Sequence, residues 1–372
     1  MTVRILTGDV REQLKTLADD SVDCVVTSPP YWGLRDYGVE GQLGMERTLG
    51  EHIAVMVEVF ADVRRVLKPA GTLWLNYGDC YATHPNGKSA AAYKADGSDD
   101  RTFRDKPFST VGPIYISDQR NKDRRGNRST LNGAPPPDTP GRIAAGGYLK
   151  PKDLCMIPNR LAIALQDDGW WVRSEIIWSK PNPMPESVTD RPAGTHEKVW
   201  LLTKSQRYHF DAEAIMEECS PNTHARVSQD VANQVGSERA NGGRKTNGNM
   251  KAVVRSPKIT EAGSGNRNNQ SFVDAACLLT LKRNARNVWE IPTAAFSEAH
   301  FATFPPALVE RCLLAGCPKG GIVLDPFFGA GTTGLVADRL GLDCTGIELN
   351  PAYVAIARSR ITDDAPLFTE VV

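Results

Sequence analysis

The 372-residue sequence has no surplus of charge of either sign, because 44 Lys and Arg residues balance 44 Asp and Glu residues. Any binding of nucleic acid must therefore come from local basic surfaces. The eight cysteines never form a Cys-x-x-Cys pair, so we expect no zinc or other metal site and a reduced, cytoplasmic environment. No apolar run approaches the length of a bilayer span, and the N-terminus lacks the apolar region of a signal peptide, so we expect no membrane partner.

A short apolar stretch followed by two prolines organises the first part of the chain. Residues 22–26 (Val-Asp-Cys-Val-Val) have the β-branched pattern of a strand buried in a parallel sheet. Pro29 and Pro30 then end the strand and leave free carbonyl groups beside the Ser28 hydroxyl and two aromatic rings. Open α/β folds bind their ligands at this edge of the sheet. A plain Pro-Pro turn with core aromatics is the alternative interpretation of this segment taken alone.

The other regular segments alternate between strand and helix patterns, which predicts an α/β fold. Strands are expected at residues 3–7, 72–77, 170–178, 198–203, 321–324 and 343–348, with residues 68–71 as a turn. Helices are expected at about 10–17, 51–67, 153–167, 305–315, 332–340 and 351–361. Two polar stretches rich in Gly, Pro and Asn interrupt this pattern, so the chain divides into segments 1–81, 82–150, 151–211, 212–290 and 291–372.

The last segment has the pattern of a site for a ligand that contains ribose. A buried strand leads to Asp325 and the glycine-rich turn 329–334, a helix follows, and the next strand ends in Glu348. Glycines let the backbone approach a ligand, the helix offers free N–H groups, and the carboxylate accepts from ribose hydroxyls. Residues 329–334 satisfy G-x-G-x-x-G, so an NAD-dependent oxidoreductase is one interpretation. Asp325 would repel a pyrophosphate but suits the cationic amino acid part of S-adenosylmethionine.

Both polar insertions are basic although the whole chain is neutral. Residues 82–150 hold twelve basic and seven acidic side chains, and residues 222–287 hold eleven basic and four acidic ones, a net charge of +7. Solvated loops are one interpretation; surfaces that grip phosphates and read base edges are the other, and we favour it. The candidate DNA-binding residues are Arg124, Arg125, Arg244, Lys245 and Arg255.

In motif content and order the chain resembles the amino-methylating DNA methyltransferases of the β arrangement, in which the catalytic motif precedes the cofactor motif. Ser28-Pro29-Pro30-Tyr31 is similar to the loop that holds the target base, and Phe327/Phe328-Gly329-Ala330-Gly331 is similar to the cofactor loop. Residues 300–305 and the Gly8-Asp9 turn resemble two further cofactor segments. The resemblance implies a Rossmann-like sheet of about seven mostly parallel strands with circularly permuted motifs. It also implies S-adenosylmethionine as cofactor and double-stranded DNA as substrate.

The resemblance assigns roles to individual positions and segments. It implies a catalytic half at 1–81, a base-pocket turn within 151–211 and a cofactor half at 291–372; we assign 82–150 as a DNA clamp and 212–290 as the target-recognition segment. The catalytic residues are Ser28, Pro29, Pro30 and Tyr31, and the base pocket adds Trp32, Trp178 and Lys180, although a simple proline-rich turn is the other interpretation of residues 178–183. The cofactor residues are Asp9, Phe301, Thr303, Pro305, Asp325, Pro326, Phe327, Phe328, Gly329, Gly331, Thr332, Thr333, Glu348 and Asn350.

Ser28, the first residue of the Ser-Pro-Pro-Tyr loop, indicates which base receives the methyl group. Serine there resembles the cytosine-N4 enzymes, whereas Asp or Asn is commoner in adenine-N6 enzymes, so cytosine is favoured and adenine is the alternative. No cysteine follows a proline, so the Pro-Cys nucleophile of ring-carbon cytosine methyltransferases is absent. An RNA or protein amino-methyltransferase and a catalytically silent DNA-binding protein are less favoured. Relatives are often dimers and can be paired with a restriction nuclease, so the sequence leaves a homodimer and such a partner open.

Overall fold

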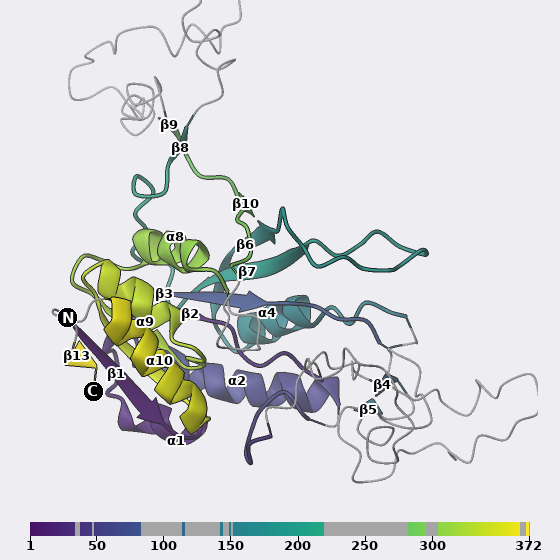
Figure 1. Cartoon of the computed structure of the whole chain (residues 1–372), viewed down its shortest axis with the longest axis horizontal. Helices are drawn as coiled ribbons and strands as arrows, with labels where there is room; N and C mark the ends of the chain where they lie inside the picture. The colour runs from purple at the N-terminus through teal and green to yellow at the C-terminus, as the bar shows by residue number, and fades with distance from the viewer. Residues whose placement is uncertain are drawn as a thin grey trace, which may run out of the picture. The chain divides into compact units, whose positions relative to one another are not determined.

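The computed structural model describes residues 1–33, 38–46, 48–82, 114–115, 142–143, 149, 152–218, 282–294, 304–364 and 370–371. The chain divides into two compact units, one of Met1–Asp211 with Arg286–Val372 and one of Ala212–Ala285. In the part of the chain that is described, no helix has the length and apolar character needed to cross a membrane. The first unit contains the sheet and all the helices described below (Figure 1).

A nine-stranded sheet forms the centre of the first unit, with the order β10-β6-β7-β3-β2-β11-β12-β1-β13. Only β7 runs antiparallel to its neighbours within this sheet, and the other pairs are parallel. This arrangement confirms the predicted Rossmann-like fold, and all seven predicted strands are present. The strands are β1 (Thr2–Thr7), β2 (Val22–Thr27), β3 (Leu67–Tyr77), β6 (Trp171–Ser179), β7 (His196–Thr203), β10 (Val288–Glu290), β11 (Ile322–Asp325), β12 (Asp343–Glu348) and β13 (Glu370–Val371).

The two unpredicted strands, β10 and β13, are at the edges of the sheet and are too short to show an apolar alternation. Strand β10 lies inside the segment 212–290 that the sequence assigned to an insertion, and it pairs with β6. Two further pairs are small: β4 (Ile114–Tyr115) with β5 (Arg142–Ile143), and, in the second unit, β8 (Glu217–Glu218) with β9 (Lys282–Arg283).

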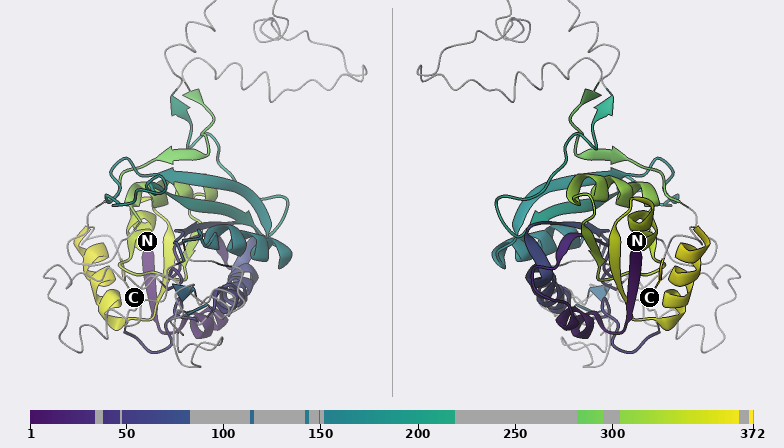
Figure 2. Two further views of the ribbon diagram at one scale, coloured as in Figure 1. Left: turned by 90° about the vertical axis from the view of Figure 1, so that its right-hand side faces the viewer. Right: turned by 90° about the vertical axis from the view of Figure 1, so that its left-hand side faces the viewer.

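Helices cover both faces of the large sheet (Figure 2). One face carries a contacting group of α1 (Val10–Gln13), a 3₁₀ turn (Leu14–Thr16), α2 (Leu49–Val66) and α4 (Ile157–Asp167). The other face carries a second contacting group, which consists of α8 (Pro306–Gly316), α9 (Thr332–Arg339) and α10 (Pro351–Asp364). The strands between them read as continuous apolar runs because both of their faces are buried.

Helix α2 shows how sequence signals set these elements. Thr48 and Glu51 form a capping box, each side chain accepting a hydrogen bond from the other's backbone N–H, and the apolar residues of the helix face the core. The predicted turn at residues 68–71 is wrong, because β3 begins at Leu67 directly after the helix. The register with β2 jumps from Val22↔Leu67 to Cys24↔Thr72, so residues 68–71 form a bulge within the strand.

Strands β2 and β11 are neighbours at the centre of the sheet although about 300 residues separate them in the chain. From this pair the chain continues to β3 on one side and to β12 on the other, which makes it the point where the strand order reverses. The carboxyl ends of both strands therefore open into a crevice, the place where α/β sheets bind ligands. The Ser-Pro-Pro-Tyr loop follows β2 and the glycine-rich turn follows β11, so the two predicted motifs meet there.

Candidate active site

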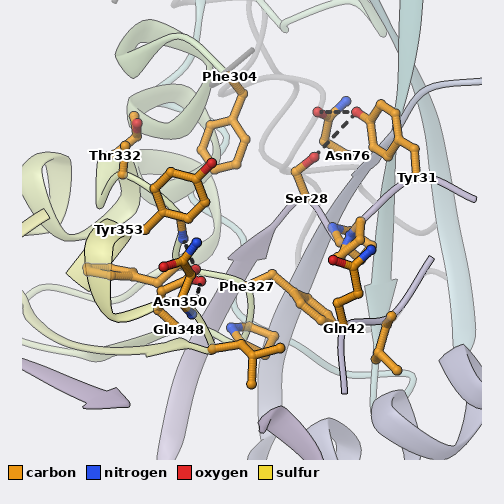
Figure 3. A pocket seen from close by; sticks show the side chains of 18 of the residues that line it. Ser28, Tyr31, Gln42, Asn76, Phe304, Phe327, Thr332, Glu348, Asn350 and Tyr353 are labelled. Carbon is orange, nitrogen blue, oxygen red and sulfur yellow. Dashed lines mark hydrogen bonds between the residues drawn. The ribbon is translucent and has the colours of Figure 1, made fainter. Parts of the chain in front are cut away.

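One cavity of about 570 Å³ occupies this crevice. Figure 3 shows Ser28, Tyr31 and Asn76 grouped on one side and Glu348, Asn350 and Tyr353 on the other. The cavity therefore joins the two motifs that the sequence predicted to act together. The predicted residues that line it are Asp9, Ser28, Pro29, Pro30, Tyr31, Trp178, Lys180, Pro326, Phe327, Phe328, Gly329, Thr332, Glu348 and Asn350.

Five predicted residues that the structure describes are not among those that line the cavity. Trp32, Pro305, Asp325, Gly331 and Thr333 are placed elsewhere. Phe301, Thr303, Arg124, Arg125, Arg244, Lys245 and Arg255 lie outside the described residues.

The catalytic loop is held from beneath by a buried chain of polar groups. The Tyr77 hydroxyl accepts a hydrogen bond from the Trp32 backbone N–H over 3.0 Å and donates to the Pro30 carbonyl over 3.2 Å. The imidazole of His52 lies between Tyr77 Oη, at 2.7 Å, and a carboxylate oxygen of Glu46, at 2.8 Å. These contacts fix the conformation of the loop at both ends of Pro30-Tyr31-Trp32.

Trp32 does not belong to the base pocket to which the sequence assigned it. Its side chain is 0% exposed and belongs to the hydrophobic core, and its indole N–H donates to the Glu46 carbonyl over 2.9 Å. The neighbouring Tyr31 faces the cavity, but one face of its ring stacks on Tyr77 with centroids 4.7 Å apart. Tyr31 is thus half of an aromatic pair and presents its remaining surface to the cavity.

The turn between β6 and β7 contributes a second wall. Trp178 and Glu197 are direct partners in the antiparallel register, and Lys180 follows at the end of β6. The Lys180 ammonium forms an ion pair with Glu197 and lies 4.5 Å from the centroid of the Trp178 ring. Lys180 and Trp178 are therefore at the cavity, as predicted, and are tied to a carboxylate that the sequence did not single out.

The cofactor half of the cavity is built from the ends of β11 and β12. Glu348 accepts hydrogen bonds from the backbone N–H groups of Gly329 (2.8 Å) and Asn350 (2.7 Å), which fix its carboxylate at the cavity wall. Burial raises the pKa of Glu348, and these two hydrogen bonds oppose that effect. Gly329 has a φ of +52°, and a Cβ at this position would meet only open space. A ligand can therefore approach the backbone closely here.

Gly331 has a different role from the one the motif suggests. It precedes α9 with a φ of +75°, and a Cβ there would lie 2.8 Å from the Cβ of Ala357 on α10. Glycine is needed at this position for the left-handed conformation and for close packing between the two helices. Pro305 likewise is the residue that precedes α8.

Asp325, which the sequence assigned to cofactor binding, does not line the cavity either. It is 1% exposed, and its carboxylate accepts hydrogen bonds from Thr27 Oγ1 (2.7 Å), Thr333 Oγ1 (2.6 Å) and the Phe327 N–H (3.0 Å). Asp325 thus connects β2, the glycine-rich turn and α9 from below. Burial raises the pKa of Asp325 to about 6, although its three donors favour the charged form.

The raised pKa of Asp325 predicts a pH dependence of stability. The folded protein holds this proton more tightly than the unfolded chain, so the group's contribution to stability is complete below pH 3.8 and is lost as the pH rises through about 6. Two pKa units correspond to about 3 kcal/mol. We expect the free energy of unfolding of the wild type, measured relative to Asp325→Asn by urea denaturation, to fall by about that amount between pH 4 and pH 7. A difference that does not vary with pH would contradict this assignment.

Several cavity residues were missed by the sequence analysis. Asn76 and Glu197 lie within strands: Asn76 is a polar residue near the end of an apolar run, and Glu197 stands between two other polar residues before the apolar part of β7. Phe304 lies within the predicted cofactor segment 300–305, but the sequence analysis selected Phe301, Thr303 and Pro305 from it and not Phe304. The others that line the cavity include Gln42, Met184, Glu186, Thr293 and Tyr353.

Known proteins with similar sequences identify the family. The model of the N6/N4 methyltransferases, described as DNA methylase, matches residues 22–359. The chain belongs to this family. It is a DNA methyltransferase that methylates amino groups and uses S-adenosylmethionine.

Individual relatives agree with the assignment, and one solved structure shares the fold. This methylase is 40% identical to the type II methyltransferase M.SmaI of Serratia marcescens, over 96% of the chain and 90% of the relative. It is 38% identical to the type II methyltransferase M.Cfr9I of Citrobacter freundii, over 95% and 86%. The solved structure named PvuII DNA methyltransferase (cytosine-N4-specific) has the same fold, with a TM-score of 0.53 at 16% identity, covering 98% of this chain and 91% of that one.

The residues of the cavity fit the cofactor of the family. The open space at Gly329, the carboxylate of Glu348 and the aromatic and apolar side chains of the wall provide backbone approach, a hydroxyl acceptor and surface for a planar base. Asp9 also lines the cavity, where the Arg11 guanidinium hydrogen-bonds its carboxylate and lowers its pKa.

Proposed function

We propose that this methylase transfers a methyl group to N4 of a cytosine that has been flipped out of duplex DNA. The observation that carries the proposal is the single cavity shared by the Ser28 loop and the Glu348 wall. A cofactor bound at the wall and a base bound at the loop would meet within it. When bound, S-adenosylmethionine supplies an electrophilic methyl group, and residues such as Glu348, Asn350 and Phe327 would hold it.

The chain's own residues act on the target amino group. The lone pair of an exocyclic amine is delocalised into the ring, so the enzyme must localise it and hold the nitrogen in line with the methyl carbon. Acceptors for the amino hydrogens achieve this, and the Ser28 hydroxyl and the Pro29 carbonyl are the groups we assign. The atom is inaccessible within a duplex, so the base must be flipped out at a cost of a few kcal/mol. Contact with Tyr31 and Trp178 offsets part of that cost.

Adenine-N6 methylation by the same site is the second candidate function. The family model covers both N6 and N4 activities and therefore supports either base, whereas serine at position 28 supports cytosine. The names of the relatives also suggest that this methylase serves a type II restriction-modification system with a cognate nuclease.

Nucleoside mass spectrometry tests which base is modified. Plasmid and phage DNA from cells without DNA methyltransferases is incubated with the purified protein and isotopically labelled S-adenosylmethionine, then digested. We expect labelled N4-methylcytosine in the digested DNA. In a control reaction without DNA, we expect no labelled nucleoside. Labelled N6-methyladenine would replace the cytosine proposal with the second candidate, and label found only with RNA or protein substrates would remove both.

A further inference from the structure

Polar side chains on the base side of the cavity form one connected hydrogen-bond chain. Ser28 Oγ donates to the Tyr31 hydroxyl over 3.3 Å, and that hydroxyl donates to Glu197 Oε2 over 2.8 Å. The same carboxylate oxygen accepts from Asn76 Nδ2 over 3.1 Å, and the other oxygen accepts from Lys180. All of these side chains line the cavity, and Figure 3 shows how Ser28, Tyr31 and Asn76 meet.

The hydrogen bonds from Ser28 through Tyr31 to Glu197 can run in only one donor-to-acceptor direction. A carboxylate has no hydrogen to give, so Tyr31 must donate to Glu197 and can only accept from Ser28. Burial raises the pKa of Tyr31 well above its usual value, so the phenol keeps its single hydrogen. The Asn76 carbonyl oxygen is also within 3.3 Å of the Tyr31 hydroxyl, but the charged oxygen of Glu197 is the shorter and stronger acceptor.

This direction determines what Ser28 can offer to a substrate. Its one hydrogen is committed to Tyr31, which leaves the oxygen lone pairs for a donor in the cavity. The amino group of a target base brings hydrogens and therefore needs acceptors. If position 197 were neutral, the Tyr31 hydroxyl could turn and donate to Ser28, and the Ser28 hydrogen would then point toward the cavity.

We propose that Glu197 is a positioning residue that acts through Tyr31 to keep the Ser28 oxygen an acceptor toward the target amino group. The inference rests on the role assigned to Ser28 under the proposed function. The carboxylate is suited to this task because Lys180 balances its charge and two further donors, from Tyr31 and Asn76, hold it in place.

Single-turnover methylation rates of four proteins test the inference: wild type, Glu197→Gln, Ser28→Ala and the double variant. Glutamine keeps the size of the side chain and removes its charge. We expect Glu197→Gln to lower the rate by about 10- to 100-fold, the scale on which misoriented catalytic groups act, with the KM for DNA and the Kd for S-adenosylmethionine unchanged. In the Ser28→Ala background the same change should have less than about a twofold effect, because its target is absent.

Two controls separate positioning from folding. Glu175→Gln breaks the ion pair of Glu175 with Lys198 on the same strand pair, 2.6 Å long and outside the cavity, and should leave the rate unchanged. Tyr31→Phe removes the connecting hydroxyl and should reproduce the rate loss of Glu197→Gln without adding to it. An equal loss from Glu197→Gln in both backgrounds, or no loss in the wild type, would overturn the inference. The cytosine proposal is tested separately, by identifying the base that the wild-type protein methylates.

Discussion

Replacing Ser28 by alanine is expected to lower the rate of methyl transfer by about 100- to 1,000-fold, the loss seen when one preorganised polar contact to a transition state is removed. The substitution deletes the hydroxyl that would accept from the target amino group. The cofactor wall is built from different elements, the turn after β11 and the end of β12, so the Kd for S-adenosylmethionine should change by less than about twofold. Single-turnover methylation and calorimetric titration measure the two quantities.

Two further variants sharpen this experiment. Ser205→Ala removes a serine hydroxyl that hydrogen-bonds the Pro69 and Arg207 carbonyls away from the cavity, and it should leave both quantities unchanged. Ser28→Asn keeps an acceptor oxygen at the loop and should recover part of the lost rate. If Ser28→Ala instead weakened cofactor binding as much as it slowed transfer, the serine would belong to the cofactor site.

Removing the basic segment after β8 is expected to abolish methylation at a specific sequence while cofactor binding persists. The structure shows where to cut: β8 and β9 pair antiparallel, Glu217 opposite Arg283 and Glu218 opposite Lys282, so an Asn-Gly turn can join Glu218 to Lys282. The longer deletion of 222–287 would be harmful, because the Asn287 carbonyl accepts from the Ile177 N–H over 2.8 Å and its side chain donates to the Glu175 carbonyl. Methylated sites are mapped by sequencing, and cofactor binding is titrated.

A charge variant of the full-length chain complements the deletion. Changing Arg244, Lys245 and Arg255 to glutamine should weaken binding to duplex DNA and reduce the slope of log K against log salt by up to about 3, roughly one for each DNA phosphate that is no longer neutralised. Loss of cofactor binding in the deletion would mean that this segment belongs to the catalytic core. Site-specific methylation that survives it would assign recognition to another part of the chain, with residues 82–150 the next candidate.

Sequence reasoning located the site because its main parts are short motifs at strand ends. The Ser28 loop, the turn at 325–334 and Glu348 each follow an apolar run, and parallel strands bring such ends to one edge. Glu197 could not be found in this way, since it meets Tyr31 only through the pairing of β7 with β3 and β6.

The two corrections have the same kind of cause, which is the direction of a side chain. Tyr31 and Trp32 are adjacent and both aromatic, yet only the folded loop determines that one faces the cavity and the other the core. Asp325 has the position expected of a ligand-binding acid, but Thr27, from the other half of the chain, and Thr333 turn its carboxylate inward. No local sequence pattern predicts hydrogen-bond partners that are so distant in the chain.

The pairing of β2 with β11 also sets the order in which the molecule can be completed during synthesis. At about 5–20 residues per second, β2 leaves the ribosome roughly 15 to 60 seconds before β11 exists to cover its edge. Until then the apolar β2 has one open side, and the catalytic loop has no cofactor wall opposite it. The N-terminal half therefore has an open strand edge during synthesis, and the site is complete only after β11 and β12 have been made and have paired with the sheet.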